Sequence, residues 1–487
     1  MKVRSRASKG DFWRDFWRDF RCGMAVCLAL AGLTGAAEAE SPAQIDPPFH
    51  FLRYDDDFRF LASKPDLTLW ERFKYIPLGS SAHGPVWLSL GGELRERWES
   101  YQHINYCIGK VQAASGYLLE RANINADLHV TDYLRGWVTL GDDRIFGRRG
   151  ASSSADTDRW ELFQRFVEAR PPSPFGDVPS IRYGREELSF GFQRLIAARE
   201  GPNVRRDFDG LRVTDKIGAA SVDILAVQPT VNTEWAMNDS TNRNQRMSGV
   251  YVTTPVLGPL QTDLYVLDYE NNSIKLRGLS GSEKAQTFGA RLFGKAGGFD
   301  WNVEGSWQTG RFLTGATTYD VEAHLLAALA GYTFADQPFT PRIGFSANDA
   351  SGDNARDKTT IGTFNAMFPR LPYFAETAIL VPSNVRDIRP VFSFTPCERV
   401  EVVLGYDMLW RASTTDGLYG SGFVALANTS KASGSRVGSE VSIDARWQVN
   451  QFLQLGAILA QFQAGPALTT AGGKDMTYSV LFAKLKF

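Results

Sequence analysis

Arginine and carboxylate side chains recur at every second position in several stretches of the sequence. In residues 88–99 (LSLGGELRERWE), Glu93, Arg95 and Arg97 share one face of an extended chain. The corresponding faces of other stretches carry Arg121, Arg165, Arg291, Arg389, Arg411 and Arg446, interleaved with Asp127, Glu304, Asp387, Asp407 and Asp444. A guanidinium group binds a carboxylate through two parallel hydrogen bonds, so a ladder of arginines can pass an anionic polymer from one contact to the next. The alternative is that the mixed charges pair with each other and brace the fold.

Signals for catalysis are poor. The histidines are scattered, at His50, His83, His103, His129 and His324, without metal-ligand spacing, and no GxSxG, HExxH or phosphate-loop motif occurs. Adjacent acids such as Glu186 and Glu187 would face opposite sides of a strand, which does not suit a glycosidase pair. The sequence therefore predicts that the protein is not an enzyme and implies no metal or organic cofactor.

The arginine-bearing stretches are strand-like segments of roughly ten residues, which begin near residue 86 and are separated by polar or turn-like residues. Their other faces are apolar, admit Ala and Gly in mid-strand, and concentrate Trp and Tyr near the strand ends. This pattern is typical of a lipid-facing band between aromatic girdles, and it favours a transmembrane antiparallel β-barrel over a soluble sandwich. A charge at the lipid-facing midplane costs roughly 2–4 kcal/mol, so the arginines are expected to face the lumen.

The segments number about eighteen up to residue 487, which allows an aqueous channel. Short links, such as residues 131–134 and 296–299, alternate with longer ones, among them residues 270–284, 309–318 and 347–384. This asymmetry is typical of periplasmic turns and extracellular loops. Residues 320–334 can also be read as a helix, and residues 359–382 show no clear period. Cys107 is expected outside and Cys397 at a periplasmic turn, with no disulfide between them.

The N-terminal region indicates export. Residues 1–39 combine basic residues, a short apolar run and an Ala-Glu-Ala site, which together predict a cleaved signal peptide. Residues 40–85 do not alternate and are expected on the periplasmic side or at the mouth of the lumen. The barrel itself is expected over residues 86–487. A formal net charge of −1 argues against nucleic acid as a partner.

Three stretches carry a resemblance to a known family: residues 183–213 (YGREELSFGFQRLIAAREGPNVRRDFDGLRV), residues 88–99, and residues 384–390 (NVRDIRP). They resemble the alginate-export family of Gram-negative outer-membrane barrels, and the similarity runs over about residues 52–487. Its most specific part is a GRxEL strand followed by an AREGPNVRxxFDG loop and a return strand. The resemblance implies an eighteen-stranded exporter whose arginine-rich lumen passes a uronate polymer. It also implies lumen or constriction positions for Arg185, Glu187, Arg199, Arg205 and Arg212.

We therefore expect an outer-membrane channel that passes an anionic or polar solute by diffusion, with a uronate polysaccharide such as alginate as one candidate. Outer-membrane lipid and the solute are the expected partners, and a periplasmic export complex is a further candidate. The alternatives are a porin for small molecules, a closed structural or adhesive barrel, and a secreted all-β polysaccharide-active enzyme. The mixed charges of the predicted lumen leave the solute undecided.

Overall fold

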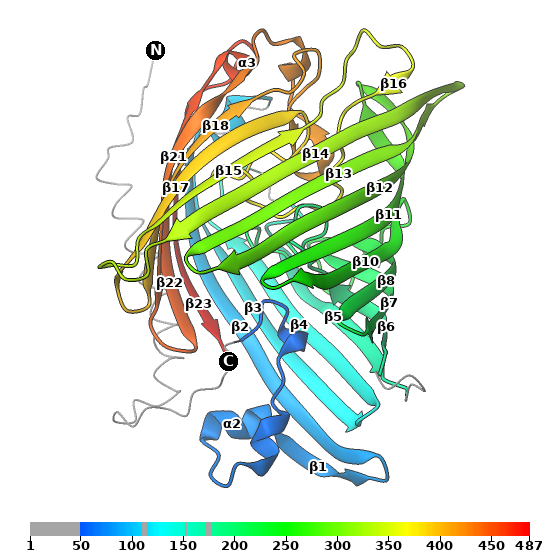
Figure 1. Ribbon diagram of the computed structural model, residues 1–487, viewed down its shortest axis with the longest axis vertical. Helices are drawn as coiled ribbons and strands as arrows, with labels where there is room; N and C mark the ends of the chain where they lie inside the picture. The colour runs from blue at the N-terminus through cyan, green and yellow to red at the C-terminus, as the bar shows by residue number, and fades with distance from the viewer. Residues whose placement is uncertain (1–48, 110–113, 151–152, 172–177) are drawn as a thin grey trace, which may run out of the picture.

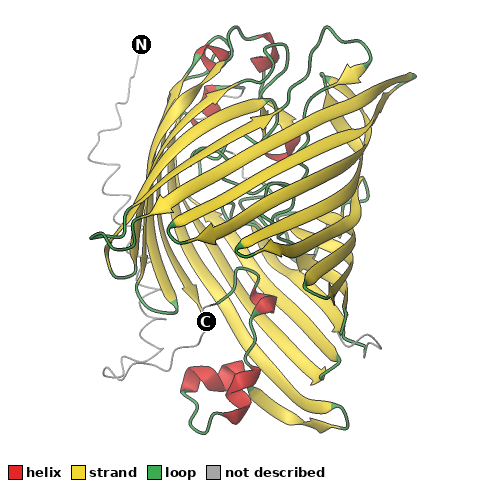
Figure 2. Cartoon of the chain, viewed as in Figure 1, coloured by secondary structure: helices red, strands yellow, loops and turns green. Residues whose placement is uncertain are grey.

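The structure is a computed structural model that describes residues 49–109, 114–150, 153–171 and 178–487, so the predicted signal peptide lies outside the described residues. Eighteen antiparallel strands form one closed barrel (Figures 1 and 2), which confirms the predicted fold class and strand number. The barrel closes where the last strand pairs with the first, from Glu93 opposite Lys486 to Gln102 opposite Thr477. The barrel strands are β2 (Gly84–Gln102), β3 (Ser115–Thr131), β4 (Leu134–Phe146), β5 (Asp158–Ala169), β6 (Ser180–Glu187), β7 (Asp207–Ile217), β8 (Ala220–Val231), β10 (Gln245–Leu257), β11 (Leu260–Leu276), β12 (Leu279–Ala296), β13 (Phe299–Thr314), β14 (Thr317–Thr333), β15 (Arg342–Ala350), β17 (Val385–Cys397), β18 (Val400–Trp410), β21 (Arg436–Gln448), β22 (Leu453–Ala464) and β23 (Met476–Lys486).

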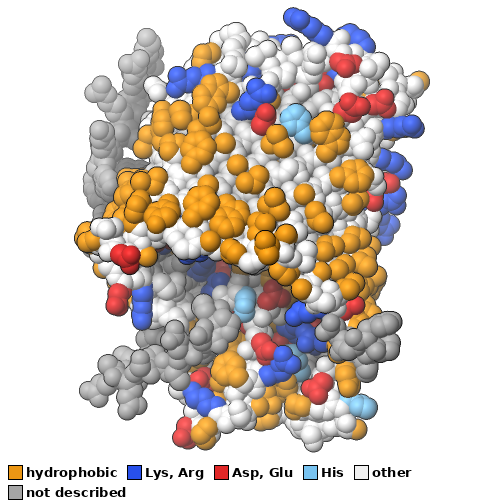
Figure 3. All heavy atoms as spheres, in the orientation of Figure 1, with side chains coloured by type: hydrophobic (Ala, Val, Ile, Leu, Met, Phe, Trp, Pro, Cys, Tyr) orange, Lys and Arg blue, Asp and Glu red, His pale blue; other side chains and the backbone are white. Residues whose placement is uncertain are grey.

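Along the strands of the wall, outward-facing apolar residues alternate with inward-facing polar ones, as expected for a membrane barrel. In β13, Val303 and Trp307 are exposed on the outer face, whereas Glu304, Ser306 and Gln308 are buried on the lumen side. Apolar side chains gather in a broad band over the outside of the strands (Figure 3). An apolar outer face around a polar interior is what lipid on one side and water on the other select. Among the described residues, no helix is long and apolar enough to cross a membrane.

Short hairpins lie at one end of the barrel, which we name the turn end; the opposite end is the loop end. The predicted short links at residues 131–134 and 296–299 are confirmed there. The predicted long loops at 270–284 and 309–318 are wrong, because β11 pairs with β12 to Leu276 opposite Leu279 and β13 with β14 to Thr314 opposite Thr317. These strands continue beyond the apolar band, where polar residues on both faces look like a loop in the sequence.

Residues 320–333 belong to β14 and are not helical. The helix-like appearance arises because both faces of this strand are apolar. Val321, Ala323 and Leu325 are buried on the lumen side, although a lumen face should be polar. They pack against a loop inside the barrel, so this part of the lumen is a hydrophobic core and not a water-filled space.

Two loops leave the wall and fold into the lumen. We name residues 188–206, between β6 and β7, lumen loop A, and residues 362–384, between β15 and β17, lumen loop B. They meet at a parallel bridge between Ile196 and Phe368, where the Phe368 N–H donates to the Leu195 carbonyl at 3.0 Å. Lumen loop B accounts for the stretch that showed no period in the sequence, since it is neither strand nor helix. Both loops are joined to the wall by one hydrophobic cluster, which includes Leu188, Leu195, Ile196, Tyr251, Tyr265, Leu325, Phe364 and Phe368.

The segment before the barrel lies at the turn end (blue in Figure 1) and contains the 3-10 helices η1 (Arg53–Asp55) and η2 (Arg59–Ser63), α2 (Leu69–Lys74) and β1 (Ile76–Ser81). Thr68 starts α2 with a capping box, because its hydroxyl accepts from the Glu71 N–H while the Glu71 carboxylate accepts from the Thr68 N–H. The Tyr54 ring enters the barrel and packs edge-on against Trp137 and Phe166. Residues 49–56 thus narrow the turn-end mouth.

The two cysteines of the described residues are free. Cys107 is buried in the loop-end 3-10 helix η3 (Ile104–Cys107), and Cys397 is exposed at the turn-end end of β17. The two residues lie at opposite ends of the barrel, as the sequence predicts.

Candidate solute pathway in the lumen

Lumen loop A is fixed to the wall by two strand arginines. Arg121, which is 0% exposed, donates to the Asn203 carbonyl at 2.8 Å and the Pro202 carbonyl at 2.7 Å. Arg95 donates to the Glu200 carbonyl at 2.7 Å. Both arginines face inward as predicted. Their hydrogen-bonding capacity is largely spent on loop carbonyls, so they position the loop and leave little for a passing solute.

Arg205 of lumen loop A lies at the centre of an acidic cluster between the loop and the wall. Its guanidinium is 3.3 Å from the Glu187 carboxylate, 3.6 Å from Glu93 and in hydrogen-bond contact with Glu200. Burial alone would raise the pKa of Glu200, but Arg205, followed by Lys484 and Arg121, holds that pKa well below its ordinary value. This cluster is an ion network that docks the loop against the wall.

Above the cluster lies a cavity of about 570 Å³, which we name the lumen pocket. Its walls come from strands β2, β3, β21, β22 and β23 on one side and from both lumen loops on the other. Its charged lining consists of Arg95, Arg97, Arg148, Arg370, Arg389, Arg446 and Lys484 with Glu99, Asp156, Glu200 and Glu376. Seven basic groups against four acidic ones leave an excess of three positive charges, which favours anions.

The lumen pocket narrows at a neck formed by Arg370, Tyr373, Phe374 and Arg389. These four residues also line a smaller cavity of about 130 Å³ that continues toward the turn end, beside Arg342. Residues shared by two successive cavities form the boundary between them. The neck is therefore the narrow point on a candidate path through the barrel.

Arg370 is the cation of the neck without an acidic partner. Among the described residues, no carboxylate lies within 4.0 Å of its guanidinium, and its Nε atom is buried without a hydrogen-bond acceptor. It stacks over Phe192, 4.5 Å from the ring centre. Burial, with smaller contributions from Arg194 and Arg389, lowers the pKa of Arg370 to about 10, so the group is still charged at neutral pH. Arg389 differs because it pairs with Glu376 at 3.3 Å and Asp407 at 3.1 Å.

Several predicted site residues face the lumen but are paired. Arg97 contacts Glu99 at 2.6 Å, Arg212 contacts Asp223 at 2.8 Å, Arg291 contacts Asp263, and Arg446 contacts Asp444 at 2.6 Å. Of these, the Arg446 side chain is the most open, at 51% exposed. Each of these arginines therefore pairs with an acid of the wall, which supports the interpretation that most of them brace the fold.

Other predicted site residues lie elsewhere. Arg165 is opposite Val138, which is exposed on the outer face, and Arg185 is opposite Arg165. Opposed residues of a ladder share a face, so both arginines lie on the outer side of the ladder. Arg165 is exposed there, whereas Arg185 is 2% exposed and pairs with Asp209 at 2.8 Å. The expectation that they line the lumen is incorrect. Their position follows from the strand register, which the sequence alone did not give.

Arg411 is also outside the pathway, since it donates to the carbonyls of Thr429 and Ala432, both at 2.8 Å, and clamps a loop at the loop end. Arg199 belongs to lumen loop A, where burial lowers its pKa to about 10 and Asp207 opposes that shift. Glu187 does reach the interior, through Arg205.

Arg370 and Arg148 are pathway residues that sequence reasoning missed. Arg370 stands in residues 368–374 (FPRLPYF), where two prolines interrupt any strand. A basic residue between prolines and aromatics within a long aperiodic stretch was the available signal. Without a strand register, nothing in the sequence indicated that this stretch folds back into the lumen.

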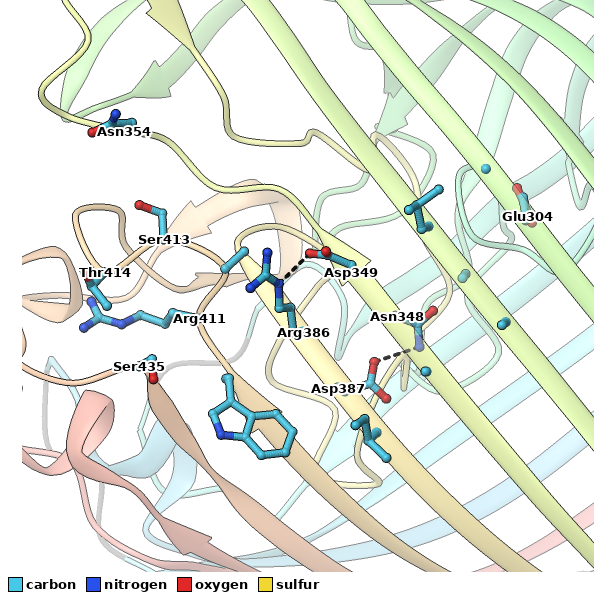
Figure 4. A pocket seen from close by; sticks show the side chains of 18 of the residues that line it. Glu304, Asn348, Asp349, Asn354, Arg386, Asp387, Arg411, Ser413, Thr414 and Ser435 are labelled. Carbon is cyan, nitrogen blue, oxygen red and sulfur yellow. Dashed lines mark hydrogen bonds and ion pairs between the residues drawn. The ribbon is translucent and has the colours of Figure 1, made fainter.

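Figure 4 shows the residues that line a third cavity, which we name the rim pocket and which has a volume of about 1050 Å³. Its apolar lining includes Val303, Leu326 and Ile388, all exposed on the outer face. Arg386 and Asp349 point toward one another across β17 and β15 and pair at 2.9 Å. The apolar part of the rim pocket lies on the outer face of the wall, although Asn348 and Asp387, which line the smaller lumen cavity, also border it.

Comparisons with known proteins agree with this architecture. The model of the alginate export family matches residues 86–482. Among solved structures, the chain is similar to OccAB1 of Acinetobacter baumannii, with 11% identity and a TM-score of 0.55 over 85% of this chain and 99% of that one. It is also similar to OccK2 (OpdF) of Pseudomonas aeruginosa, solved in complex with glucuronate, with 11% identity and a TM-score of 0.53 over 82% and 98% of the two chains. At these identities the similarity shows the fold alone. No curated protein sequence matches the chain.

Proposed function

This chain belongs to the alginate export family and is an outer-membrane channel, and we propose that its lumen passes a carboxylate-bearing solute by diffusion through the Arg370–Arg389 neck. The observation that carries the proposal is the unpaired, partly buried Arg370 at the point where the two lumen cavities meet. A charge without a partner in a poorly solvated site attracts an anion more strongly than a paired one.

The rest of the lumen pocket supports an anionic solute. Arg97, Arg446 and Lys484 lie along its wall, each beside an acid that limits how tightly a solute can bind. Rings of basic side chains select anions in pores, and weak successive sites let the solute leave. A carboxylate approaching Arg370 can take up the fork of N–H donors for which the protein supplies no acceptor.

A uronate is the solute class that fits this chemistry best, because its planar carboxylate matches the guanidinium fork and its hydroxyls match the polar lining. The phenolic ring of Tyr373 and the ring of Phe374 at the neck offer apolar faces to a sugar ring. We propose a uronate sugar or a short uronate chain as the solute, and the family resemblance supports a polymer.

Replacement of Arg370 by Gln tests the proposal. We expect the wild-type channel to be anion-selective, and we expect R370Q to lower the chloride-to-potassium permeability ratio roughly threefold or more, because the neck loses its uncompensated charge. The measurement is the reversal potential of the channel in a planar bilayer under a KCl gradient. The matched control is R165Q, which removes the same group from the outer face and should leave the reversal potential unchanged.

Block of the ion current by the solute identifies its class. Glucuronate and a short uronate oligomer should reduce the current through the wild type more than neutral glucose does, and R370Q should weaken the block. Equal reversal potentials for R370Q and the wild type would reject the arginine neck. A wild-type barrel that inserts but conducts no ions would favour the closed structural barrel instead.

A further inference from the structure

Strand β5 extends beyond its ladder with β6. The β5–β6 ladder ends at Arg165 opposite Arg185, so β5 residues before Phe163 have no partner strand on that side. Residues 232–239, which follow β8 and which we name the bridge segment, cover this free edge. The Arg159 N–H donates to the Glu234 carbonyl at 3.2 Å, and the Met237 N–H donates to the Trp160 carbonyl at 3.3 Å.

Three carboxylates meet where the bridge segment contacts β5. One oxygen from each of Asp158, Glu161 and Asp239 lies within 4.8 Å of the others. Asp158 is 0% exposed and Glu161 2% exposed. The Asn232 amide spans two of them, donating to Asp239 at 2.9 Å and to Asp158 at 3.3 Å.

Positive charge from the protein does not balance this cluster. Within the described parts of the chain, no Lys or Arg nitrogen lies within 4.0 Å of the Asp158 or Asp239 carboxylate, and Glu161 has one distant pair with Arg165 at 3.9 Å. Arg185 is turned toward the Asp239 carbonyl, at 3.5 Å, while its ion pair is with Asp209. Three acids with so little compensation repel one another unless a cation or protons neutralise them.

Asp158 gives a second, independent indication of a ligand. Its Oδ1 atom is buried and accepts no hydrogen bond, although its Oδ2 atom shares the Asn232 amide with Asp239. A buried carboxylate oxygen without a donor or a metal costs free energy comparable to a lost charged hydrogen bond.

We propose that Asp158, Glu161, Asp239 and Asn232 form a calcium site that fastens the bridge segment to the free edge of β5. All the available ligands are oxygens, which suits a hard divalent cation, and the irregular arrangement suits the flexible coordination of Ca²⁺ better than the strict octahedron of Mg²⁺. A half-turn of the Asn232 amide would place its carbonyl oxygen where its nitrogen now lies, which supplies a fourth ligand. The site would seal the wall where strand pairing is missing.

Terbium luminescence tests the site directly in the full-length barrel in detergent. Tb³⁺ replaces Ca²⁺ at oxygen sites, and Trp160 stands between Asp158 and Glu161 in the chain to sensitise it. We expect saturable Tb³⁺ emission on tryptophan excitation, displaced by Ca²⁺ at lower concentration than by Mg²⁺. D158N and D239N should weaken Tb³⁺ binding at least about tenfold. The matched control is E234Q, an exposed acid of the same bridge segment, which should bind Tb³⁺ as the wild type does.

Thermal stability gives a second measurement, which can be made on the wild type and on D239N even if D158N does not fold. The temperature at which heat-modifiable migration on a gel is lost should rise by several degrees for the wild type with Ca²⁺ and fall with a chelator. D239N should be less stable than the wild type in Ca²⁺ but at least as stable in chelator, because it relieves repulsion that the cation otherwise neutralises. Emission unaffected by both D158N and D239N, or a wild-type midpoint indifferent to Ca²⁺, would overturn the proposal.

Discussion

Removal of residues 365–383 from lumen loop B is expected to raise the single-channel conductance roughly three- to tenfold, because an eighteen-stranded barrel without its internal loops encloses a wide aqueous channel. The ends of this excision already lie together. The Phe364 and Asn384 N–H groups both donate to the Ser351 carbonyl, at 3.0 and 3.1 Å, so two glycines can join them. The excised segment is a compact loop whose ends are close together. Its removal therefore does not require the flanking strands to change register.

The variant loses hydrogen bonds as well as an obstruction. Asn365 donates to Glu283 at 2.7 Å, and the Glu376 N–H donates to Glu440 at 2.6 Å. Water entering the widened lumen should replace these partners. Planar-bilayer recording measures the conductance, and trimming of the β13–β14 hairpin tip at residues 313–318, which lines no lumen cavity, is the control. A conductance equal to that of the wild type would mean that lumen loop B does not limit the current.

Replacement of Arg205 by Met is expected to lower the free energy of unfolding by about 3–5 kcal/mol, because it leaves the buried Glu187 carboxylate without its cation and leaves Glu93 with Arg121 alone. Arg206 supplies a matched control. Its guanidinium stacks over Phe368, 5.1 Å from the ring centre, and no carboxylate within the described chain lies within 4.0 Å of it. R206M should therefore change the free energy of unfolding by less than about 1 kcal/mol. Urea titration followed by heat-modifiable migration measures both variants.

The two proteins should also differ in their dependence on pH. In the wild type, burial raises the pKa of Glu200, whereas Arg205, Lys484 and Arg121 lower it. The lowering effects are larger, so the pKa lies well below 4.5. A carboxylate with a lowered pKa stabilises the fold above its unfolded pKa, and this stability is lost as pH falls through the folded value. The contribution of Glu200 to the wild-type urea midpoint should therefore stay constant from pH 8 to about 5 and be lost as the pH falls below 4.5.

In R205M, Glu200 loses its main cation, and its pKa rises toward the unfolded value while Lys484 and Arg121 still lower it. The part of the stability that depends on Glu200 is therefore smaller, so the R205M midpoint should fall less than the wild-type midpoint when the pH drops below 4.5. Parallel pH profiles for R205M and the wild type would show that Arg205 does not hold this cluster.

The strand alternation in the sequence was sufficient to predict the barrel and its strand number, because a wall between lipid and water imposes a strict period of two. It was also sufficient to place Arg95, Arg97 and Arg446 on the lumen face. Register was harder to predict. Arg165 was placed inside because it looks like a polar position of a strand, and Arg185 because the family resemblance implied it. The faces of both residues depend on pairing with Val138, which no local pattern reveals.

The interior of the barrel was the part that the sequence did not predict. Arg370 reaches the neck through lumen loop B, whose path is set by contacts with β12, β13, β14 and β21 that lie far away in the sequence. The apolar residues on the lumen face from Val321 to Leu325 were a nearby sign of that loop in the sequence. They fitted a helix as well as a strand that is covered by a loop. The strand prediction assumes that lumen-facing residues are polar. Where a loop packs against the inside of the wall, as it does at β14, the lumen-facing residues are apolar instead.

Arg53 donates to the carbonyls of Gly92 and of Phe487, at 2.9 and 3.1 Å, and the latter contact joins residues 434 positions apart. Phe487 itself exchanges backbone hydrogen bonds with Gly92. The Phe487 acceptor for Arg53 is in place only once β23 has paired with β2, so the segment that precedes the barrel in the chain completes its docking last. Docking of Arg53 would thus mark the completion of barrel closure. In a late assembly intermediate whose hairpins have already formed, residues 49–56 should still be accessible to protease.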